Sequence, residues 1–466
     1  MTAAARENPY TQGIATFVAG LRYEQIPAEV IARIKLLILD ALGCAIVGSE
    51  LEWSRILMTT LAAVDRSTEC AVWGTDRRLS APHAALVNGT LVHGFELDDV
   101  HRQGVLHVGA VTLPALLAVA ELRPGINGRD FLTAAVAGYE IGPRVGMCMG
   151  PEHIGQGWHS GATVGVFAAA AGAAAGLRLS VDQVVHALGI AGTQSAGLMA
   201  AQFGAMVKRM HAGRAAQSGL YGALLAEAGF TGITDVFESP YGGFCTTFSR
   251  SQDRFDLTQL TADLGRRFET MQIALKFYSC VGSNHTTLDA IRKIRERRPF
   301  GPQDVEKIVV HGSQVTVDHV GWPYRPQGMT SAQLNLPYCV ATLLIEGDVF
   351  VGQFSDAVIA DPARMALADR VEVRHDPAIT ARGSKFRHMV RVEVLLTDGI
   401  QHEEVVEAAR GNEREFASDA DVVAKFGKLA RRVLSAEQAD RIVDHVLSCE
   451  KITDIGTLVR ALIPAR

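Results

Sequence analysis

The sequence contains no pair of closely spaced cysteines. Its seven cysteines are scattered along 466 residues, and no two of them form a C-x-x-C motif. Iron–sulfur clusters are usually held by closely spaced thiolates, so this spacing argues against such a cluster. An odd number of scattered cysteines is typical of free thiols in a reducing compartment, and we therefore expect a cytoplasmic protein.

The sequence also has little excess charge and no segment suited to crossing a membrane. Its formal net charge is −5, and its lysines and arginines form no basic stripe, so we expect no nucleic acid partner. The start of the chain lacks the pattern of a signal peptide. Residues 162–177 are apolar, but the run is short for a membrane span, which predicts a buried helix and no membrane partner.

Helical patterns dominate the first 260 residues. Residues 11–47 have helical spacing of apolar positions on either side of Pro27. Ser180 and Gln183 form a predicted capping box at a helix start, and Gly229 is a predicted helix end for a helix from about His211. No alternation of strands and helices appears in this part of the chain.

The pattern changes after residue 260. Residues 306–317 and 371–375 are β-like, and a hairpin is predicted around Asp398-Gly399. Residues 330–344 and 351–367 are predicted helices, and the last fifty or so residues are helical again. At 466 residues the chain should form two domains. We expect a mostly α protein, with a large all-helical domain from residues 1–273 and 411–466 and a smaller α+β domain from residues 274–410.

The most polar cluster stands directly before an apolar run. It places six titratable side chains within fifteen residues: His93, Glu96, Asp98, Asp99, His101 and His107. Burial and proximity shift pKa values of such groups toward neutrality, which is what proton transfer needs. The same residues could form a metal site or a solvated turn. Because their spacing fits no standard zinc or facial-triad pattern, we expect no metal.

Four further segments carry a resemblance together with this cluster. NGTLVHGFELDDVH is followed, in order, by GWHSGAT, KRMHAGRAAQ, KFYSC and SAQLNLPYCVA. These five blocks resemble the MmgE/PrpD family, which includes 2-methylcitrate dehydratase, cis-aconitate decarboxylase and iminodisuccinate epimerase. The resemblance implies a helical domain with an α+β lid, a homodimer, an active site between the domains, and catalysis without metal or organic cofactor.

The resemblance also implies the site residues. The matching positions for catalysis are His107, His159, Lys208, Lys276 and Tyr338. The matching or neighbouring positions for substrate binding are Glu96, Asp98, His211, Arg214 and Cys280. Cys280 has no evident base partner in the sequence, so we interpret it as pocket lining and not as a nucleophile. The chain departs from the family at Val100, Phe277 and Val281, where other residue types are usual, which affects the substrate more than the fold.

These residue types suit a carbanion next to a carboxylate. Lys208, Lys276 and Arg214 can stabilise the negative charge and clamp a polycarboxylate. His107 and His159 titrate near neutrality, Asp98 or Glu96 can orient an imidazole, and a helix start near His211 would bind an anion. Tyr338 can donate a hydrogen bond to a leaving hydroxyl or a carboxylate.

Several functions remain open at this point. We favour a cofactor-independent lyase that dehydrates 2-methylcitrate or citrate, with decarboxylation of a cis-aconitate-like substrate as the second choice. An epimerase of a dicarboxylate such as iminodisuccinate is the alternative, because two bases on opposite faces of a stereocentre would invert it. A homodimer that binds carboxylates without turnover is the non-enzymatic alternative.

Overall fold

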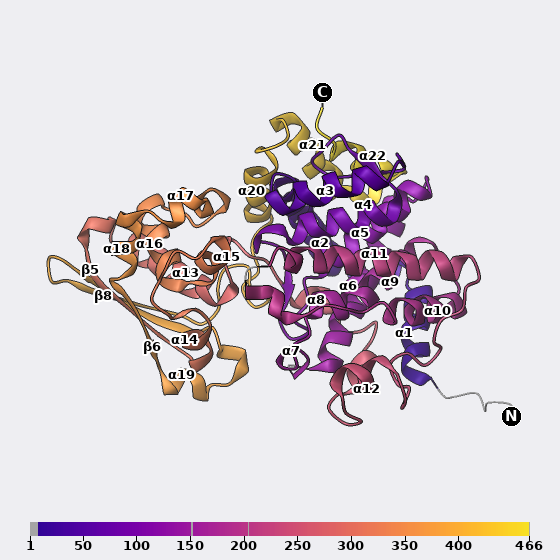
Figure 1. Cartoon of the computed structure of the whole chain (residues 1–466), viewed down its shortest axis with the longest axis horizontal. Helices are drawn as coiled ribbons and strands as arrows, with labels where there is room; N and C mark the ends of the chain where they lie inside the picture. Colours follow the sequence, from indigo (N-terminus) through magenta and orange to yellow (C-terminus); the bar gives the residue numbers. More distant parts are fainter. Residues whose placement is uncertain (1–7, 151, 204, 466) are drawn as a thin grey trace. The chain divides into compact units, whose positions relative to one another are not determined.

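The computed structural model describes residues 8–150, 152–203 and 205–465. Its contacts divide the chain into two compact units. The first unit contains the chain up to Gly94, Asp98–Ala274, and the chain from Ser418 on. The second contains Phe95–Leu97 and Leu275–Ala417. Figure 1 shows the yellow C-terminal helices beside the indigo helices of the first unit, so this unit is built from both ends of the chain.

The first unit is a bundle of helices with two very short sheets, which confirms the expected mostly α fold. Helix α9 packs against α5, α6 and α11, and α2 packs against α20. Its helices are α1 (Pro9–Gly20), α2 (Ala28–Gly48), α3 (Glu52–Val64), α4 (Ala81–Val92), α5 (Val108–Leu122), α6 (Gly128–Met149), α7 (Glu152–Gly155), α8 (Ser160–Thr163), α9 (Gly165–Gly176), α10 (Val181–Gly192), α11 (Val207–Glu227), α12 (Phe244–Ser249), α20 (Asp419–Ala430), α21 (Ala436–Leu447) and α22 (Gly456–Ala461). Strands β1 (Cys70–Ala71) and β2 (Arg78–Leu79) pair with each other, as do β3 (Val100–His101) and β4 (Ile273–Ala274).

Most predicted helix ends are confirmed, but one is wrong. The Ser180 hydroxyl accepts from the Gln183 backbone N–H in the expected capping box, and Gly229 has a φ of +90° after α11. Helix α11, however, begins at Val207 and not near His211. The polar run before His211 shows no apolar periodicity, yet Arg209 is buried against the ring of Trp53, which draws this turn into the helix. His211 therefore lies in the second turn, and Lys208 lies at the helix start.

The second unit is a four-stranded sheet with helices. The strand order is β6-β5-β7-β8, with β5 and β6 parallel and the other pairs antiparallel. Alternate residues of β7 are buried, and α13 packs against β7 and β8, so helices cover one face of the sheet (Figure 1). The strands are β5 (Val305–Gly312), β6 (Val371–His375), β7 (Val390–Leu396) and β8 (Gln401–Val406). The helices are α13 (Gly282–Arg297), α14 (Gln314–Val320), α15 (Met329–Leu334), α16 (Leu336–Glu346), α17 (Asp356–Ile359), α18 (Pro362–Ala368) and α19 (Pro377–Ala381).

Three predictions in this unit differ from the structure because polar residues cap helices. The helix predicted for residues 351–367 is divided into α17 and α18, since the Asp361 side chain accepts from the Ala363 N–H and starts α18. The strand predicted to reach Val317 ends at Gly312, since the Ser313 hydroxyl accepts from the Thr316 backbone N–H and starts α14. The helix predicted for residues 330–344 is interrupted at Asn335, whose side chain accepts from the Tyr338 N–H at the start of α16. The predicted hairpin at Gly399, with a φ of +81°, is confirmed.

Two further predictions concern the whole described chain. All seven cysteines are free and buried, as their spacing predicts. Among the helices of residues 8–150, 152–203 and 205–465, none combines the length and the apolar character that a membrane crossing needs.

Close contact between α4 and α11 aligns two stretches that carry titratable residues. Gly89 of α4 faces Gly213 of α11, and a Cβ at Gly213 would lie 1.9 Å from the carbonyl oxygen of Leu86. No side chain fits in that space, because a backbone atom cannot move away as a flexible side chain could. The two helices therefore hold His93, at the end of α4, in a fixed relation to His211 on α11.

The variant Gly213→Ala tests this contact. We expect the added methyl to separate α4 from α11 and to lower the free energy of unfolding by about 3 kcal/mol. Gly20→Ala is the matched control, because nothing lies within 4 Å of a Cβ at the end of α1. Urea denaturation followed by circular dichroism measures both variants. Equal stability of the two would contradict the proposed close contact.

Candidate active site

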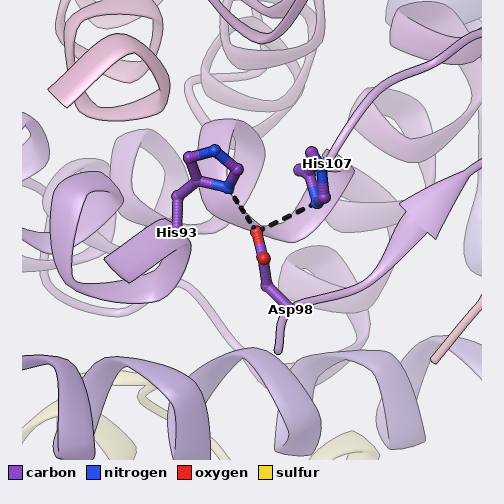
Figure 2. Close-up of side chains that lie close together, drawn as sticks. All are labelled: His93, Asp98 and His107. Atoms are coloured by element: carbon purple, nitrogen blue, oxygen red, sulfur yellow. Dashed lines mark hydrogen bonds and ion pairs between the residues drawn. The ribbon is translucent and has the colours of Figure 1, made fainter. Parts of the chain in front are cut away.

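A fully buried carboxylate is the centre of the polar cluster in the first unit. Asp98 has no exposed surface, and its Oδ2 lies 2.9 Å from Nδ1 of His93 and 3.2 Å from Nδ1 of His107. Figure 2 shows both rings turned toward this one oxygen. His93 directly follows α4, and His107 is the residue before the first turn of α5. Two helix ends thus bring the imidazoles to a common carboxylate.

The hydrogen bonds show that Nδ1, the ring nitrogen that faces Asp98, carries a hydrogen in both His93 and His107. Nδ1 of His107 also lies 2.7 Å from the backbone carbonyl oxygen of Asp99, and a carbonyl can only accept. Nδ1 of His107 therefore carries a hydrogen, which leaves Nε2 for chemistry. Burial would raise the pKa of Asp98, but the His107 and His93 charges and hydrogen bonds outweigh it and hold the pKa well below its usual range. The side chain of His107 is 18% exposed, whereas that of His93 is 1% exposed.

These three residues also satisfy the spacing of a metal-binding group. One ligand atom from each of His93, Asp98 and His107 lies within 4.8 Å of the others. Coordination would need the lone pair of Nδ1 on each ring, since Nδ1 is the nitrogen that faces Asp98. In His107 that nitrogen donates to the Asp99 carbonyl, so its lone pair is not available. The donor set therefore fits a hydrogen-bonded cluster better than a metal site.

Further buried charge lies next to this cluster. Both carboxylate oxygens of Asp99 accept from the Gly109 backbone N–H at 3.1 Å. Burial, and then the charges of Asp98 and Asp40, raise the pKa of Asp99 to about 7, although the hydrogen bond from the Gly109 N–H lowers it. Asp40 on α2 forms a fully buried ion pair of 2.5 Å with Lys425 on α20. Lys425, from the C-terminal helices, thus offsets part of the buried negative charge of Asp40, Asp98 and Asp99.

Two more histidines continue the row of imidazoles. His159 precedes α8, and its Nδ1 lies 3.0 Å from Nδ1 of His211 on α11. The ring centroids are separated by 4.5 Å between His107 and His93, 6.0 Å between His93 and His159, and 5.0 Å between His159 and His211. Burial, followed by the charges of His93 and Lys208, holds the pKa of His159 well below its usual range. Burial and Lys208 also lower the pKa of His211, so both rings are neutral near pH 7.

The second unit has its own polar group. Nζ of Lys276 lies 3.2 Å from Oε2 of Glu96, and both side chains are buried. Glu96 has a φ of +56°, a backbone conformation that a non-glycine residue rarely adopts. Burial would raise the pKa of the Cys280 thiol, but a hydrogen bond with Cys339 and the nearby His285 and Lys276 lower it to about 6. Cys280 therefore lies near Lys276 in the second unit.

Two expected site residues have other contacts. The Tyr338 hydroxyl donates to the backbone carbonyl of Gln353 at 2.6 Å, so its hydrogen is already in use. Arg214 is exposed on α11 and hydrogen-bonds the side chain of Gln217 on the same helix. No hydrogen bond or ion pair joins Arg214 to the histidines in the part of the chain that the structure describes.

Comparison with known proteins settles the family. Residues 12–256 match the MmgE/PrpD N-terminal domain, and residues 278–450 match the MmgE/PrpD C-terminal domain. The chain belongs to the MmgE/PrpD family. This confirms the resemblance on which the expected fold was based.

Curated relatives of this MmgE/PrpD chain align over nearly its full length. The cis-aconitate decarboxylase-like protein oryM of Aspergillus oryzae is 36% identical over 98% of both chains. The cis-aconitate decarboxylase of Aspergillus terreus is 33% identical over 97% of this chain and 95% of its own. The human cis-aconitate decarboxylase is 27% identical over 97% of this chain and 94% of its own.

In this MmgE/PrpD chain, sequence reasoning missed two buried contacts, the one between His93 and Asp98 and the ion pair between Asp40 and Lys425. His93 was not included among the site residues, although it shares Asp98 with His107. Its place five residues before Asp98, at the end of an apolar helix, was the available signal. The ion pair between Asp40 and Lys425 joins residues 385 positions apart by their numbering, and no local pattern links them.

The raised pKa of Asp99 predicts a pH effect on stability. The folded chain holds this proton up to about pH 7, whereas the unfolded chain releases it near 3.8. The unfolded state therefore binds fewer protons in this window, and the free energy of unfolding falls as the pH rises through it. Asp99→Asn cannot ionise, so relative to the wild type it should gain up to about 1.4 kcal/mol per pH unit between pH 4 and 7.

Urea denaturation at several pH values between 4 and 7 measures this gain. Glu140→Gln is the matched comparison, because burial raises the pKa of Glu140 to about 7 at a separate place in the first unit. Each variant should remove the part of the decline in the free energy of unfolding with rising pH that its own carboxyl group causes. A constant difference between Asp99→Asn and the wild type at every pH would show that Asp99 does not titrate in this way.

Proposed function

We propose that this protein decarboxylates cis-aconitate or a closely related unsaturated tricarboxylate, without a metal or an organic cofactor. The observation that carries the proposal is the row of four imidazoles around Asp98 and Lys208, together with alignment over almost the whole chain to proteins named cis-aconitate decarboxylase. The sequence resemblance by itself favours dehydration. The names of the relatives move decarboxylation ahead of it.

The reaction needs one proton and a place for transient negative charge. In cis-aconitate the methylene carbon that carries a carboxylate is next to the double bond. When the bond to that carboxylate breaks, its electron pair forms a new double bond to the central carbon. The pair of the old double bond moves to the adjoining carbon, which takes up a proton beside its own carboxylate. Carbon dioxide leaves, and the trianion becomes the dianion of itaconate.

We assign the proton to His107. Asp98 accepts from its Nδ1 and stabilises the imidazolium, and this leaves Nε2 to give the proton to carbon. His159 is a less suitable proton donor, since burial and its cationic neighbours lower its pKa and keep the ring neutral, without a second proton to give. A neutral imidazole can still donate a hydrogen bond to a substrate carboxylate. His159 and His211 are therefore proposed as binding groups.

Lys208 supplies the positive charge in the first unit. It lies near enough to His159 and His211 to lower the pKa of both rings. A charge-assisted hydrogen bond from a lysine to a substrate carboxylate contributes about 1.5–3 kcal/mol. Lys276, which pairs with Glu96 in the second unit, is proposed as a further cationic contact, with Cys280 beside it. Tyr338 and Arg214 would each need to leave their present partners to take part.

Incubation in D₂O with EDTA tests the reaction. With cis-aconitate we expect itaconate with one deuterium on the saturated carbon next to the carboxylate and none on the terminal methylene, as read by proton NMR. Deuterium in a methyl group would mean that the double bond does not move. Parallel incubations contain 2-methylcitrate, citrate and iminodisuccinate. Conversion of one of these in place of cis-aconitate would favour the dehydratase or epimerase alternative, and loss of activity with EDTA would contradict the metal-free reaction.

Two variants test the assignment of residues. His107→Gln should lower kcat by about 10²–10⁴-fold, because the proton donor is removed. Lys208→Gln should lower kcat/KM by about 10–100-fold through one lost carboxylate contact. His375→Gln and Lys293→Gln are controls, as both side chains are exposed in the second unit. Retention of full activity in both site variants would place the reaction elsewhere.

A further inference from the structure

The loop that leads into His107 is closed by its own backbone. The N–H of His101 donates to the carbonyl of Leu106 at 2.8 Å, and the N–H of Leu106 donates back to the carbonyl of His101 at 3.2 Å. Leu106 is the residue directly before His107. Any shift of this loop therefore moves the backbone from which the His107 ring projects.

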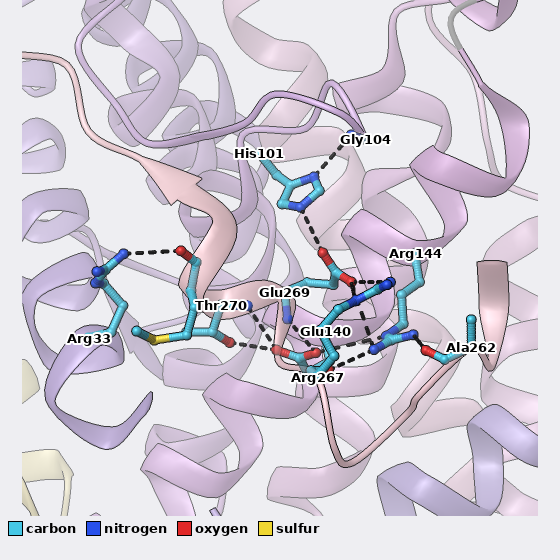
Figure 3. Close-up of polar contacts among 10 residues, drawn as sticks. Arg33, His101, Gly104, Glu140, Arg144, Ala262, Arg267, Glu269 and Thr270 are labelled. Carbon is cyan, nitrogen blue, oxygen red and sulfur yellow. Dashed lines mark hydrogen bonds and ion pairs between the residues drawn. The ribbon is translucent and has the colours of Figure 1, made fainter. Parts of the chain in front are cut away.

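The side chain of His101 holds the interior of the same loop. The N–H of Gly104 donates to Nδ1 of His101 at 3.0 Å. A ring nitrogen that accepts a hydrogen bond carries no hydrogen, so the proton of the neutral ring is on Nε2. Nε2 lies 3.2 Å from Oε2 of Glu269 and donates to it, as Figure 3 shows. Both side chains are buried, with 1% and 2% exposed.

Glu269 is itself held by several polar partners, of which Arg144 is buried and Arg267 is exposed. Nε of Arg267 donates to Oε1 of Glu269 at 2.9 Å, and Nη2 of Arg267 lies 2.8 Å from the same oxygen. Nη2 of Arg144 lies 3.8 Å from this oxygen. The backbone N–H of Glu269 donates to Glu140 at 2.8 Å. Burial would raise the pKa of Glu269, but His101 and the two arginines outweigh it and lower the pKa. An ionised carboxylate only accepts, so Glu269 selects the Nε2–H form of His101.

Helix α6 blocks the loop on one side. A Cβ at Gly104 would lie 2.6 Å from the carbonyl oxygen of Pro143, and a Cβ at Gly146 would lie 2.1 Å from the carbonyl oxygen of Gly104. The loop also holds Val105 at a φ of +49°, an unfavourable conformation for a β-branched residue. Such a residue keeps its strained backbone only where the surrounding contacts outweigh the cost.

From these contacts we propose that His101 and Glu269 are positioning residues for His107. Glu269 sets the tautomer of His101, His101 accepts from Gly104, and the closed loop fixes the direction from which His107 meets Asp98. The inference rests on the proposed function, in which His107 gives a proton to the substrate. His101 itself is not required to touch the substrate, since both of its ring nitrogens are already in use.

Two substitutions of His101 separate its two bonds. In His101→Asn the amide oxygen takes the place of Nδ1 and still accepts from Gly104. In His101→Gln the amide nitrogen takes the place of Nε2 and still donates to Glu269. Under the proposal, the hydrogen bond from Gly104 to residue 101 positions His107. In that case the kcat of the Asn variant stays within about 3-fold of the wild type. The kcat of the Gln variant falls by about 10–100-fold, with little change in KM. Steady-state kinetics with cis-aconitate gives both constants, and thermal unfolding gives the stability of each variant.

Equal losses of kcat in both variants, or an unaffected Gln variant, would overturn the proposal. A purely structural role would lower kcat in step with thermal stability, whichever bond is lost. The variant His107→Gln distinguishes failure of the proposed function from failure of the positioning role. If it is as active as the wild type, the proposed function fails, whereas an inactive His107→Gln with an active His101→Gln removes the positioning role alone.

A measurement on the wild-type protein does not depend on activity or on folding of the variants. In protein labelled with ¹⁵N-histidine, long-range proton–nitrogen spectra near pH 7 assign the hydrogen on each ring. We expect His101 to carry it on Nε2 and His107 to carry it on Nδ1. A hydrogen on Nδ1 of His101 would exclude the bond from Gly104 and contradict the proposal directly.

Discussion

The negative charge of Asp98, held without any exposed surface, is the constraint on which the candidate site depends. A buried carboxylate is costly unless donors surround it, and here the donors are the Nδ1–H groups of His93 and His107. Meeting this need fixes the tautomer and direction of both rings. His107, which keeps some exposure, is left with Nε2 available, whereas His93 is enclosed. A single electrostatic requirement thus separates a group that can react from one that supports it.

This arrangement is possible because the helices of the first unit approach one another at small residues. At Gly213 and Gly104 the neighbouring backbone lies where a side chain would otherwise be. Asp98 and Asp99 have no exposed surface, so protein groups have to satisfy most of their hydrogen-bonding capacity. Asp99 accepts twice from Gly109, and Asp40 pairs with Lys425. The price of this design is charge held in a low dielectric, which raises the pKa of Asp99 to about 7.

Sequence reasoning reached the parts of the site that local patterns encode. Asp98, His107, His159 and Lys208 stand out as polar residues within apolar stretches, and the structure brings them together within one unit. Capping residues such as Ser180 likewise predicted helix ends correctly. The start of α11 and the end of the strand before Ser313 were misplaced, because burial of Arg209 and a local side-chain cap outweighed periodicity. Long-range pairs such as Asp40 with Lys425 carry no local signal. The hydrogen bond from the Tyr338 hydroxyl to the backbone carbonyl of Gln353 likewise has no local signal in the sequence.

The roles proposed for the imidazoles differ because their charged neighbours differ. The sequence alone does not show which charged residues lie next to each ring. His159 lies near Lys208 and three other histidines. An added proton on this buried ring would meet like charge, so the ring stays neutral. His107 lies against a carboxylate that stays ionised, so an added proton there completes an ion pair. Four chemically identical side chains in one row therefore have different charged neighbours. In the proposed reaction, a trianionic substrate would meet neutral donors and a lysine at one end of the row and His107, the proposed proton donor, at the other. That asymmetry is what a decarboxylation requires, because the carboxylates must be held while one carbon alone is protonated.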